Sequence, residues 1–265
     1  MSTEEKPLTG HARDIAPLEN PIFSALSLNP RDWALFLDID GTLLDLAETP
    51  DGIVVPPDLS SDLQKLSDNM GGALALVTGR SVEFADRLFV PCHFPIAGLH
   101  GAERRLSDGK IIRLEPSFAF EQLKLDLAES AKAMPGVIVE DKGLAVAAHF
   151  RLAPEHQEAV ETMMAEALEA AGAGFALQRG KMVVEIRPSG ADKGKAVEDF
   201  MATPPFSGRQ LMVVGDDLTD EAMFKVANTV GGMAVRVGPL TPASAARFSV
   251  ASPTALRTIL GLIAP

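Results

Sequence analysis

The sequence predicts an α/β fold in which a doubly wound, Rossmann-like parallel sheet carries an inserted α+β domain. Three short apolar runs, each ending in a polar cluster, indicate the sheet. Such runs fit parallel strands covered on both faces, and open α/β sheets bind ligands outside the carboxyl ends of their strands. A stretch of alternating polar and apolar residues, at about 109–188, departs from this pattern and predicts the insert. The polar clusters are therefore expected to meet in one crevice.

The first apolar run, residues 34–37, is expected to be a buried strand because it ends abruptly in Asp38 and a Gly-Thr turn. A helix is expected over residues 58–69, where leucines recur at helical spacing and Gly71-Gly72 follows as a stop signal. This order of strand, turn and helix is the repeating unit of a doubly wound sheet. Two further units are expected, with a strand at 73–77 and a helix at 81–89, and with a strand at 211–214 and a helix at 219–227.

The insert is expected to pair two helices, at about 118–133 and 154–171, with two β-hairpins. The hairpins would have strands at 137–142 and 144–152 around Lys142-Gly143, and at 175–178 and 182–187 around Arg179-Gly180. Apolar and polar residues alternate in these strands, as burial of one face requires, so the helices would cover the apolar face. The polar residues expected on the open face are Glu140, Lys142, His149, Arg151, Glu185 and Arg187.

The chain therefore divides into three parts. Residues 1–30 mix Pro, Asn, Ser and Asp without clear periodicity, and we expect a loosely ordered N-terminal extension, although packing along the body fits the same composition. Residues 31–113 and 189–265 would form the α/β core. Residues 114–188 would form the α+β insert.

Composition narrows the function classes. Hydrophobic residues make up 46% and charged residues 23% of the 265 residues, as in ordinary globular proteins. The net charge of −12, without a run of Lys or Arg, argues against a nucleic-acid partner. The single cysteine, Cys92, excludes an intrachain disulfide and a multi-cysteine zinc site. No secretory signal or long apolar run is visible, so we expect a cytoplasmic protein without a membrane partner; a monomer is favoured, but the oligomeric state is open.

Carboxylates gather at the predicted strand ends. So many acids cannot all stay ionised in one crevice unless their pKa values rise or a cation intervenes. The nearby ligand atoms are all oxygens, without a Cys or His cluster, which favours Mg²⁺ over zinc or copper. Taken singly, several of these acids also fit ordinary turn or helix-capping residues. The acids concerned are Asp38, Asp40, Asp216, Asp217 and Asp220.

Four stretches together resemble the ordered motifs of the haloacid dehalogenase superfamily: Asp38-Ile39-Asp40-Gly41-Thr42, Thr78, Lys193 and Gly215-Asp216-Asp217-Leu218-Thr219-Asp220. The resemblance implies a phosphatase in which Asp38 attacks phosphorus, forming an aspartyl phosphate that water then hydrolyses. Asp40 would protonate the leaving oxygen and later activate the water. An anionic nucleophile attacking an anionic ester needs positive charge already in place, and Lys193 would supply it.

The same resemblance implies roles for the rest of the site. Thr78 would act with the catalytic residues by holding phosphate oxygens, as would backbone N–H groups after Asp38. The implied ligands of Mg²⁺ are Asp38, the Asp40 carbonyl and Asp216. The residues implied to orient metal-bound waters and Lys193 are Asp217 and Asp220. The residues of the turns implied to bind the substrate are Gly41, Thr42, Gly79 and Arg80.

The position of the insert suggests what it does. More than a hundred positions separate Thr78 from Lys193, so the insert resembles the second type of cap in this superfamily, which closes over the site and contributes specificity. Residues 33–237 further resemble the trehalose-6-phosphate phosphatases, which implies hydrolysis of trehalose 6-phosphate to trehalose and phosphate. The stretches that carry this resemblance are Gly98–Arg104, Asp141-Lys142, His149-Phe150-Arg151, Glu185–Pro188, Asp192-Lys193-Gly194 and Gly215–Glu221.

This second resemblance implies that the open face of the cap binds the distal glucose. The matching residues are Glu140, Lys142 and Glu185, with Arg104 near the junction of core and cap. Carboxylates and amines can read sugar hydroxyls through hydrogen bonds, although charged residues also populate exposed strand faces without any ligand. His149 and Arg151 would pair within the cap or contact the substrate.

Three other interpretations fit part of the pattern. The nearest is the same chemistry on another sugar phosphate, such as a sucrose or glycosyl-glycerate phosphate. A non-catalytic, phosphate-sensing protein of this fold would have no need to keep Asp38 and Asp40 together. A phospho-accepting receiver domain shares an aspartate at a strand end but has neither the large insert nor an acid equivalent to Asp40.

Overall fold

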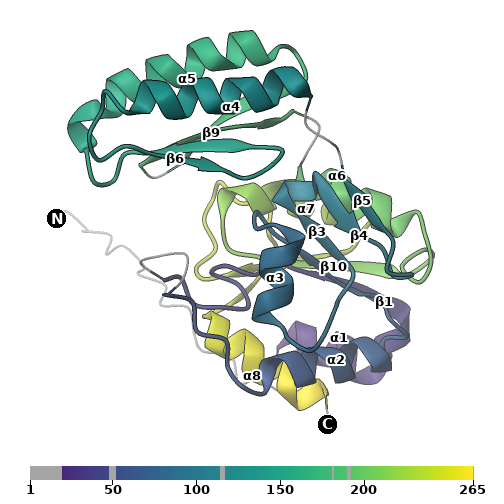
Figure 1. The fold of residues 1–265 in the computed structure, drawn as a ribbon. Helices are drawn as coiled ribbons and strands as arrows, with labels where there is room; N and C mark the ends of the chain where they lie inside the picture. Colours follow the sequence, from purple (N-terminus) through teal and green to yellow (C-terminus); the bar gives the residue numbers. More distant parts are fainter. Residues whose placement is uncertain (1–19, 48–51, 114–116, 181, 190–191, 265) are drawn as a thin grey trace, which may run out of the picture.

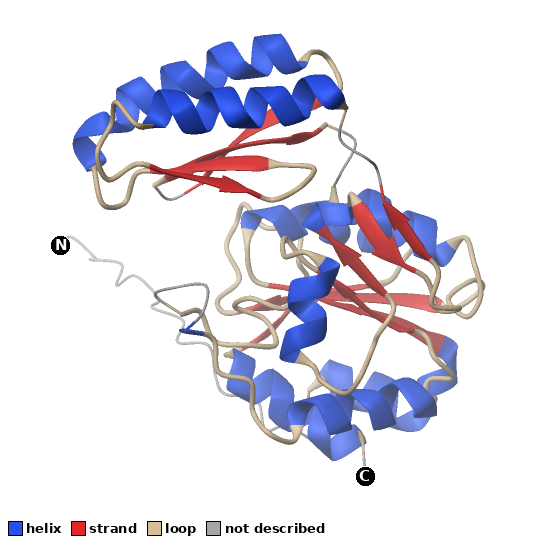
Figure 2. Cartoon of the chain, viewed as in Figure 1, coloured by secondary structure: helices blue, strands red, loops and turns tan. Residues whose placement is uncertain are grey.

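The computed structural model describes residues 20–47, 52–113, 117–180, 182–189 and 192–264. These residues build a larger α/β body and a smaller body in which α4 (Phe118–Ala131) and α5 (Gln157–Ala171) cover one face of a second sheet (Figure 1). The other face of the smaller sheet is turned toward the larger body (Figures 1 and 2). Both sheets of the predicted architecture are therefore present.

In the described part of the chain, the larger sheet has the strand order β12-β11-β10-β1-β2-β3-β4-β5. Neighbouring strands from β12 to β3 run parallel, while β4 and β5 extend one edge in antiparallel fashion. The predicted doubly wound parallel core is confirmed. The strands are β1 (Trp33–Leu37), β2 (Leu74–Val77), β3 (Ile96–Gly98), β4 (Glu103–Arg105), β5 (Ile111–Arg113), β10 (Gln210–Gly215), β11 (Met233–Val237) and β12 (Phe248–Val250).

Both faces of this sheet are buried, which is why its central strands are continuous apolar runs. In β1, Leu35 and Leu37 point into one hydrophobic cluster and Ala34 and Phe36 into another on the opposite face. The first cluster is covered by α1 (Pro21–Leu28), α2 (Leu59–Asn69), α3 (Val82–Leu88) and α8 (Pro253–Ile263). The second is covered by α6 (Lys193–Met201) and α7 (Glu221–Thr229).

The smaller sheet is antiparallel, with the order β6-β7-β9-β8. Its strands are β6 (Ile138–Asp141), β7 (Val146–His149), β8 (Phe175–Gly180) and β9 (Val183–Pro188). Val146, Val184 and Ile186 are buried beneath the two helices, together with Phe120 and Met164. Both predicted hairpins are present, but the second does not turn at Arg179-Gly180, because those residues belong to β8 and pair with Val184 and Val183 of β9. The helix expected from residue 154 begins with a short 3₁₀ turn before α5.

Of the two expectations for residues 1–30, loose order is wrong for residues 20–30, which pack along the body, while residues 1–19 lie outside the described part. Helix α1 begins at Pro21, and the Asn20 side chain caps it by accepting a hydrogen bond from the Ile22 amide at 2.9 Å. Ile22 and Leu26, one helical turn apart, are both fully buried in the core next to α8. This helix is part of the body because its apolar face completes the layer below the sheet.

The alternating pattern begins near residue 109, before the expected start of the insert at residue 114. Residues 111–113 form β5, which pairs with β4 at the edge of the larger sheet. Short 3₁₀ turns, at Leu99–Gly101 and Leu218–Asp220, follow β3 and β10.

Among the described helices, none has the length and apolar character that crossing a membrane requires.

Candidate active site

The turn after β1 brings Asp38 to the carboxyl end of the sheet. The Asp38 amide donates to the Val214 carbonyl of β10 at 3.0 Å, so the hydrogen bonding between β1 and β10 continues as far as Asp38. Gly41 has a φ of +79°, which favours glycine, and its amide donates to the Leu44 carbonyl at 2.7 Å. A Cβ at Gly41 would lie 2.2 Å from a carboxylate oxygen of Asp216. Glycine here is what allows the two loops to approach.

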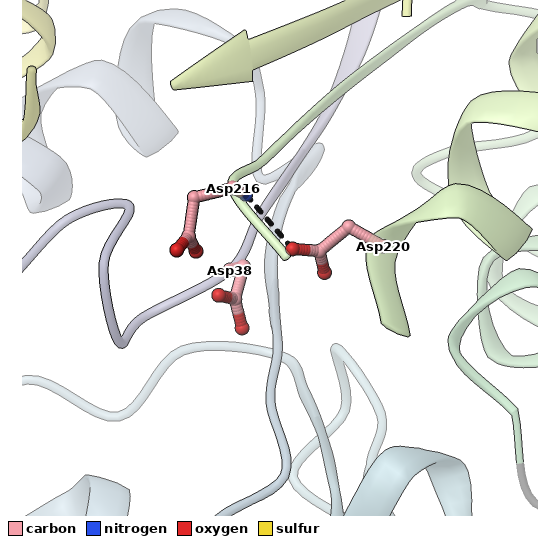
Figure 3. A group of neighbouring side chains, drawn as sticks. All are labelled: Asp38, Asp216 and Asp220. Carbon is pink, nitrogen blue, oxygen red and sulfur yellow. Dashed lines mark hydrogen bonds between the residues drawn. The ribbon is translucent and has the colours of Figure 1, made fainter. Parts of the chain in front are cut away.

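Three carboxylates meet at the ends of β1 and β10 (Figure 3). Oxygen atoms of Asp38, Asp216 and Asp220 all lie within 4.8 Å of one another. Lys193, at the start of α6, donates to Asp38 Oδ1 at 2.7 Å and to Asp220 Oδ1 at 2.6 Å. Asp38 is 4% exposed, Lys193 3% and Asp220 0%. The Thr42 hydroxyl donates to Asp216 Oδ1 at 3.0 Å, which links the two loops again.

Burial shapes the charge of this cluster. It raises the pKa of Asp38 well above its usual value, and the negative charges of Asp220 and Asp216 add to that effect, while Lys193 opposes it. Burial and the Asp220 charge raise the pKa of Asp216 to about 6. Burial by itself would lower the pKa of Lys193, but the carboxylates of Asp38 and Asp220 outweigh it and raise that pKa. The carboxylates of Asp38, Asp216 and Asp220 share the single ammonium group of Lys193, so negative charge exceeds positive charge in this cluster.

Asp220 and Asp217 differ in their positions, although the sequence suggested the same role for both. Asp220 Oδ1 accepts from Lys193, and its Oδ2 accepts from the amides of Asp216 and Asp217 at 2.9 and 3.0 Å. Both oxygens are therefore occupied by protein donors. Asp217 is exposed, and its carboxylate is not part of the three-acid cluster.

Asp40 is held by Arg80, from the loop after β2. The Arg80 Nε and Nη2 atoms donate to the two carboxylate oxygens at 2.6 and 2.7 Å. The guanidinium stacks over the Phe84 ring, 4.3 Å from its centroid. Thr78 is fully buried, and its hydroxyl accepts from the Arg80 amide at 3.1 Å. These contacts place Thr78, Gly79 and Arg80 beside the turn after β1.

His100 lies in the same region and was not assigned a role from the sequence. Its φ of +56° follows a Leu99 φ of +47°, an uncommon left-handed pair of non-glycine residues. The His100 amide donates to the Thr78 carbonyl at 2.9 Å, and a Cβ on Gly79 would lie 2.8 Å from the imidazole. Burial, together with Lys193 and other cations, lowers the pKa of His100 to about 3. The ring is therefore a neutral hydrogen-bonding group. The sequence signal that could have identified His100 is its place in the Gly98–Arg104 stretch, which resembles the family.

The open face of the smaller sheet carries a chain of paired charges. Lys142 Nζ donates to Glu185 Oε2 at 3.0 Å and lies 3.9 Å from a Glu140 oxygen. His149 Nε2 lies 2.8 Å from Glu140 Oε2. The hydrogen bond to His149 lowers the pKa of Glu140, and the charges of Lys142 and Arg80 act in the same direction. Arg80 of the core and Glu140 of this face line the same cavity, so this face lies opposite the core loops.

A cavity of about 560 Å³ lies between these loops and the open face, within the range of small-molecule sites. Arg151 is exposed just past β7 and does not line it. The described residues that line the cavity are Asp40, Gly79, Arg80, Ser81, Phe84, Leu99, His100, Glu103, Glu140, Asp141, Lys142, Gly143 and His149.

Four predicted substrate-binding residues, Gly41, Thr42, Arg104 and Glu185, are not among the described residues that line this cavity. Arg104 is the one whose strand turns it to another face. In the register of β3 and β4, Arg104 lies opposite Ala97 and Glu103 opposite Gly98, so the two side chains point to opposite faces. Arg104 forms an ion pair with Asp199 of α6. Glu103 instead lines the cavity and accepts from the Val82 amide at 3.0 Å. Side chains alternate between the two faces along β4, and for this reason Glu103 rather than Arg104 lines the cavity.

Comparisons with known proteins agree with this geometry. Residues 36–254 match the family model described as trehalose-phosphatase. A probable trehalose-phosphate phosphatase of Sinorhizobium fredii is 55% identical over 249 residues, covering 94% of each chain. The trehalose-6-phosphate phosphatase of Escherichia coli is 44% identical over 208 residues, covering 78% of this chain and 77% of the relative.

Solved structures show the same architecture. A trehalose-6-phosphate phosphatase related protein superimposes with a TM-score of 0.73 at 29% identity, over 87% of this chain and 96% of the other. A phosphatase of the HAD superfamily from Bacteroides thetaiotaomicron shares the fold with a TM-score of 0.59 at 20% identity, over 86% of this chain and 94% of the other. This architecture is the fold of the haloacid dehalogenase phosphatases, and the acidic cluster lies after β1 and β10, at the carboxyl ends of its strands. Within that class, the chain belongs to the trehalose-phosphatase family.

Proposed function

We propose that this protein hydrolyses trehalose 6-phosphate to trehalose and inorganic phosphate, with Asp38 as the nucleophile. The observation that carries the proposal is a buried Asp38 paired with Lys193 beside a cavity with a polar opposite wall. Relatives that align over most of the chain are named as a probable trehalose-phosphate phosphatase and a trehalose-6-phosphate phosphatase, which supports this substrate.

In the first step, an Asp38 carboxylate oxygen bonds to phosphorus as the bond from phosphorus to the sugar oxygen breaks. Asp40 gives the leaving oxygen its proton and then takes a proton from water. That water attacks phosphorus, which releases phosphate and restores the Asp38 carboxylate. Lys193 and the Thr78 hydroxyl hold the phosphate oxygens, and Arg80 keeps Asp40 at the edge of the cavity.

The acidic cluster fits a divalent cation, and we propose Mg²⁺. Its donors are all oxygens, which suits a hard cation, and the three clustered carboxylates share the ammonium group of Lys193. Asp38, Asp216 and the Asp40 carbonyl would hold the cation. Asp220 instead orients Lys193, because its two oxygens accept three protein donors at 2.6, 2.9 and 3.0 Å. When bound, the cation neutralises phosphate charge during transfer.

We also propose that residues 114–188 act as a specificity cap on a core made of residues 31–113 and 189–265. Glu140, Lys142 and Glu185 already form a set of ion pairs on the open face, and Glu140 and Lys142 line the cavity. They would bind the distal glucose. The neutral His100 ring on the core side can donate and accept at once, as a hydroxyl of the phosphorylated glucose requires.

The substrate assignment is tested by a panel of phosphate esters assayed with Mg²⁺. We expect kcat/KM for trehalose 6-phosphate to exceed that for sucrose 6-phosphate, glucosylglycerate phosphate and glucose 6-phosphate by about 100-fold, because unpaired polar groups in the site penalise analogues. Phosphate release from another ester at a higher kcat/KM would overturn the substrate while leaving the chemistry in place.

The cation proposal predicts a pH-dependent stabilisation by Mg²⁺. The folded-state pKa of Asp216 is raised to about 6, so protons compete with the cation below that pH. Without metal, the contribution of Asp216 to stability is fully present below its unfolded pKa and is lost as pH rises through about 6. We therefore expect added Mg²⁺ to raise Tm more at about pH 7.5 than at about pH 5.

Thermal unfolding of the wild type and of Asp216→Asn, each with and without Mg²⁺, is the measurement. The variant is expected to lose most of the Mg²⁺-induced rise in Tm. An equal rise at both pH values, or a full rise in the variant, would contradict the assigned ligand.

A further inference from the structure

A buried lysine of the cap, Lys124, has no part in the chemistry described above. It lies on α4, on the face that packs against the smaller sheet, and is only 5% exposed. Its side chain runs along the Phe120 ring, with Nζ 5.9 Å from the ring centroid. A buried lysine is uncommon unless its ammonium group is paired. Its partners therefore indicate what it is for.

The ammonium group of Lys124 has three acceptors, which matches its three donors. It donates to Asp141 Oδ1 at 2.8 Å and to the Gly143 carbonyl at 3.0 Å, and lies 2.8 Å from Glu121 Oε1. Burial alone would lower the pKa of Lys124, but the hydrogen-bonded carboxylates of Asp141 and Glu121 outweigh it and raise that pKa. Lys124 therefore carries its charge throughout the neutral range.

Two of those acceptors belong to the turn that joins β6 to β7. The Asp141 carboxylate also accepts from the Gly143 amide at 2.7 Å, and the Lys142 amide donates to the Ala145 carbonyl at 2.9 Å. Gly143 has a φ of +76°, and a Cβ there would meet nothing within 4 Å, so the tip of the turn is open. Lys124 thus ties both sides of Lys142 to helix α4.

The same turn forms part of the cavity wall. Asp141, Lys142 and Gly143 all line the cavity, and Lys142 is the residue there that pairs with Glu185. We propose that Lys124 is a positioning residue for sugar recognition, which clamps the β6–β7 turn so that Lys142 faces the cavity. The ligand concerned is the sugar of a sugar phosphate, so this inference rests on the proposed function.

The test compares Lys124→Met with Lys132→Met, a matched change at the C-cap of the same helix, at an exposed lysine that pairs with Glu129. For Lys124→Met we expect KM for trehalose 6-phosphate to rise about tenfold, with kcat within about twofold of the wild type. For p-nitrophenyl phosphate, which has no sugar, kcat/KM is expected to change by about twofold at most. Lys132→Met should match the wild type on both substrates.

Lys124→Gln is the second variant, because its amide keeps a donor near the turn and limits the loss of packing; its KM is expected to lie between those of Lys124→Met and the wild type. Circular dichroism and thermal melts establish that each variant is folded. Folded variants with the wild-type KM, or with equal losses on both substrates, would overturn the clamp alone. Wild-type protein without activity on trehalose 6-phosphate would overturn the proposed function, and the clamp with it.

Discussion

Replacing Asp38 by asparagine is expected to lower kcat for trehalose 6-phosphate by about 10⁴-fold or more, because the amide cannot form the acyl phosphate. The fold should persist, since asparagine has nearly the same shape. Without metal, Tm should stay level or rise, because the change removes one negative charge from a buried cluster in which burial, Asp220 and Asp216 raise the pKa of Asp38. Steady-state kinetics and thermal melts measure both effects.

Asp45→Asn is the matched control for this experiment. Asp45 follows in the same loop region, but its carboxylate is 67% exposed and pairs with Arg257 at 3.1 Å. The control should keep wild-type kcat. Comparable activity in Asp38→Asn and Asp45→Asn would refute the nucleophile assignment.

Lys193→Met is expected to have the second large effect, on both stability and rate. It leaves Asp38 and Asp220 buried without their cation, and breaking such a buried pair costs about 3–5 kcal/mol of unfolding free energy. The loss of positive charge at the transferring phosphate should also lower kcat/KM by about 10³-fold. Urea unfolding without metal gives the first quantity, and kinetics with Mg²⁺ gives the second.

Lys195→Met is the matched control on the same helix. Lys195 is 58% exposed and pairs with Asp199 one turn away, so its loss should leave the unfolding curve and the kinetics unchanged. Equal behaviour of the two variants would show that the buried ion pair does not organise the site.

Much of the fold could be predicted because the central strands are buried on both faces. In β1, alternate residues enter two separate clusters, so every position is apolar and the run is visible in the sequence. Strands β4 and β5 were not predicted because they are short and carry arginines, and they exist through pairing at the sheet edge. Helix α1 was missed because residues 1–30 were judged as one segment, although Asn20-Pro21 and the spacing of Ile22 and Leu26 were readable helix signals.

The candidate site could be predicted as a set of motifs, but not as a set of contacts. The face of β4 that Arg104 occupies decides its partner, and that partner, Asp199, is 95 positions away in the chain. The left-handed backbone of His100 and the double acceptor role of Asp220 likewise depend on loop geometry. Spacing alone does not encode such side-chain directions.

The attack by Asp38 is tested most directly by trapping the phosphorylated enzyme. Trehalose 6-phosphate labelled in the phosphoryl group would be mixed with the Mg²⁺-loaded protein, quenched in acid within a turnover, and the label located by peptide mapping. The label is expected on the peptide that contains Asp38, released by hydroxylamine as an acyl phosphate should be, and absent in Asp38→Asn. Rapid turnover with no labelled protein, or label on another residue, would contradict the mechanism.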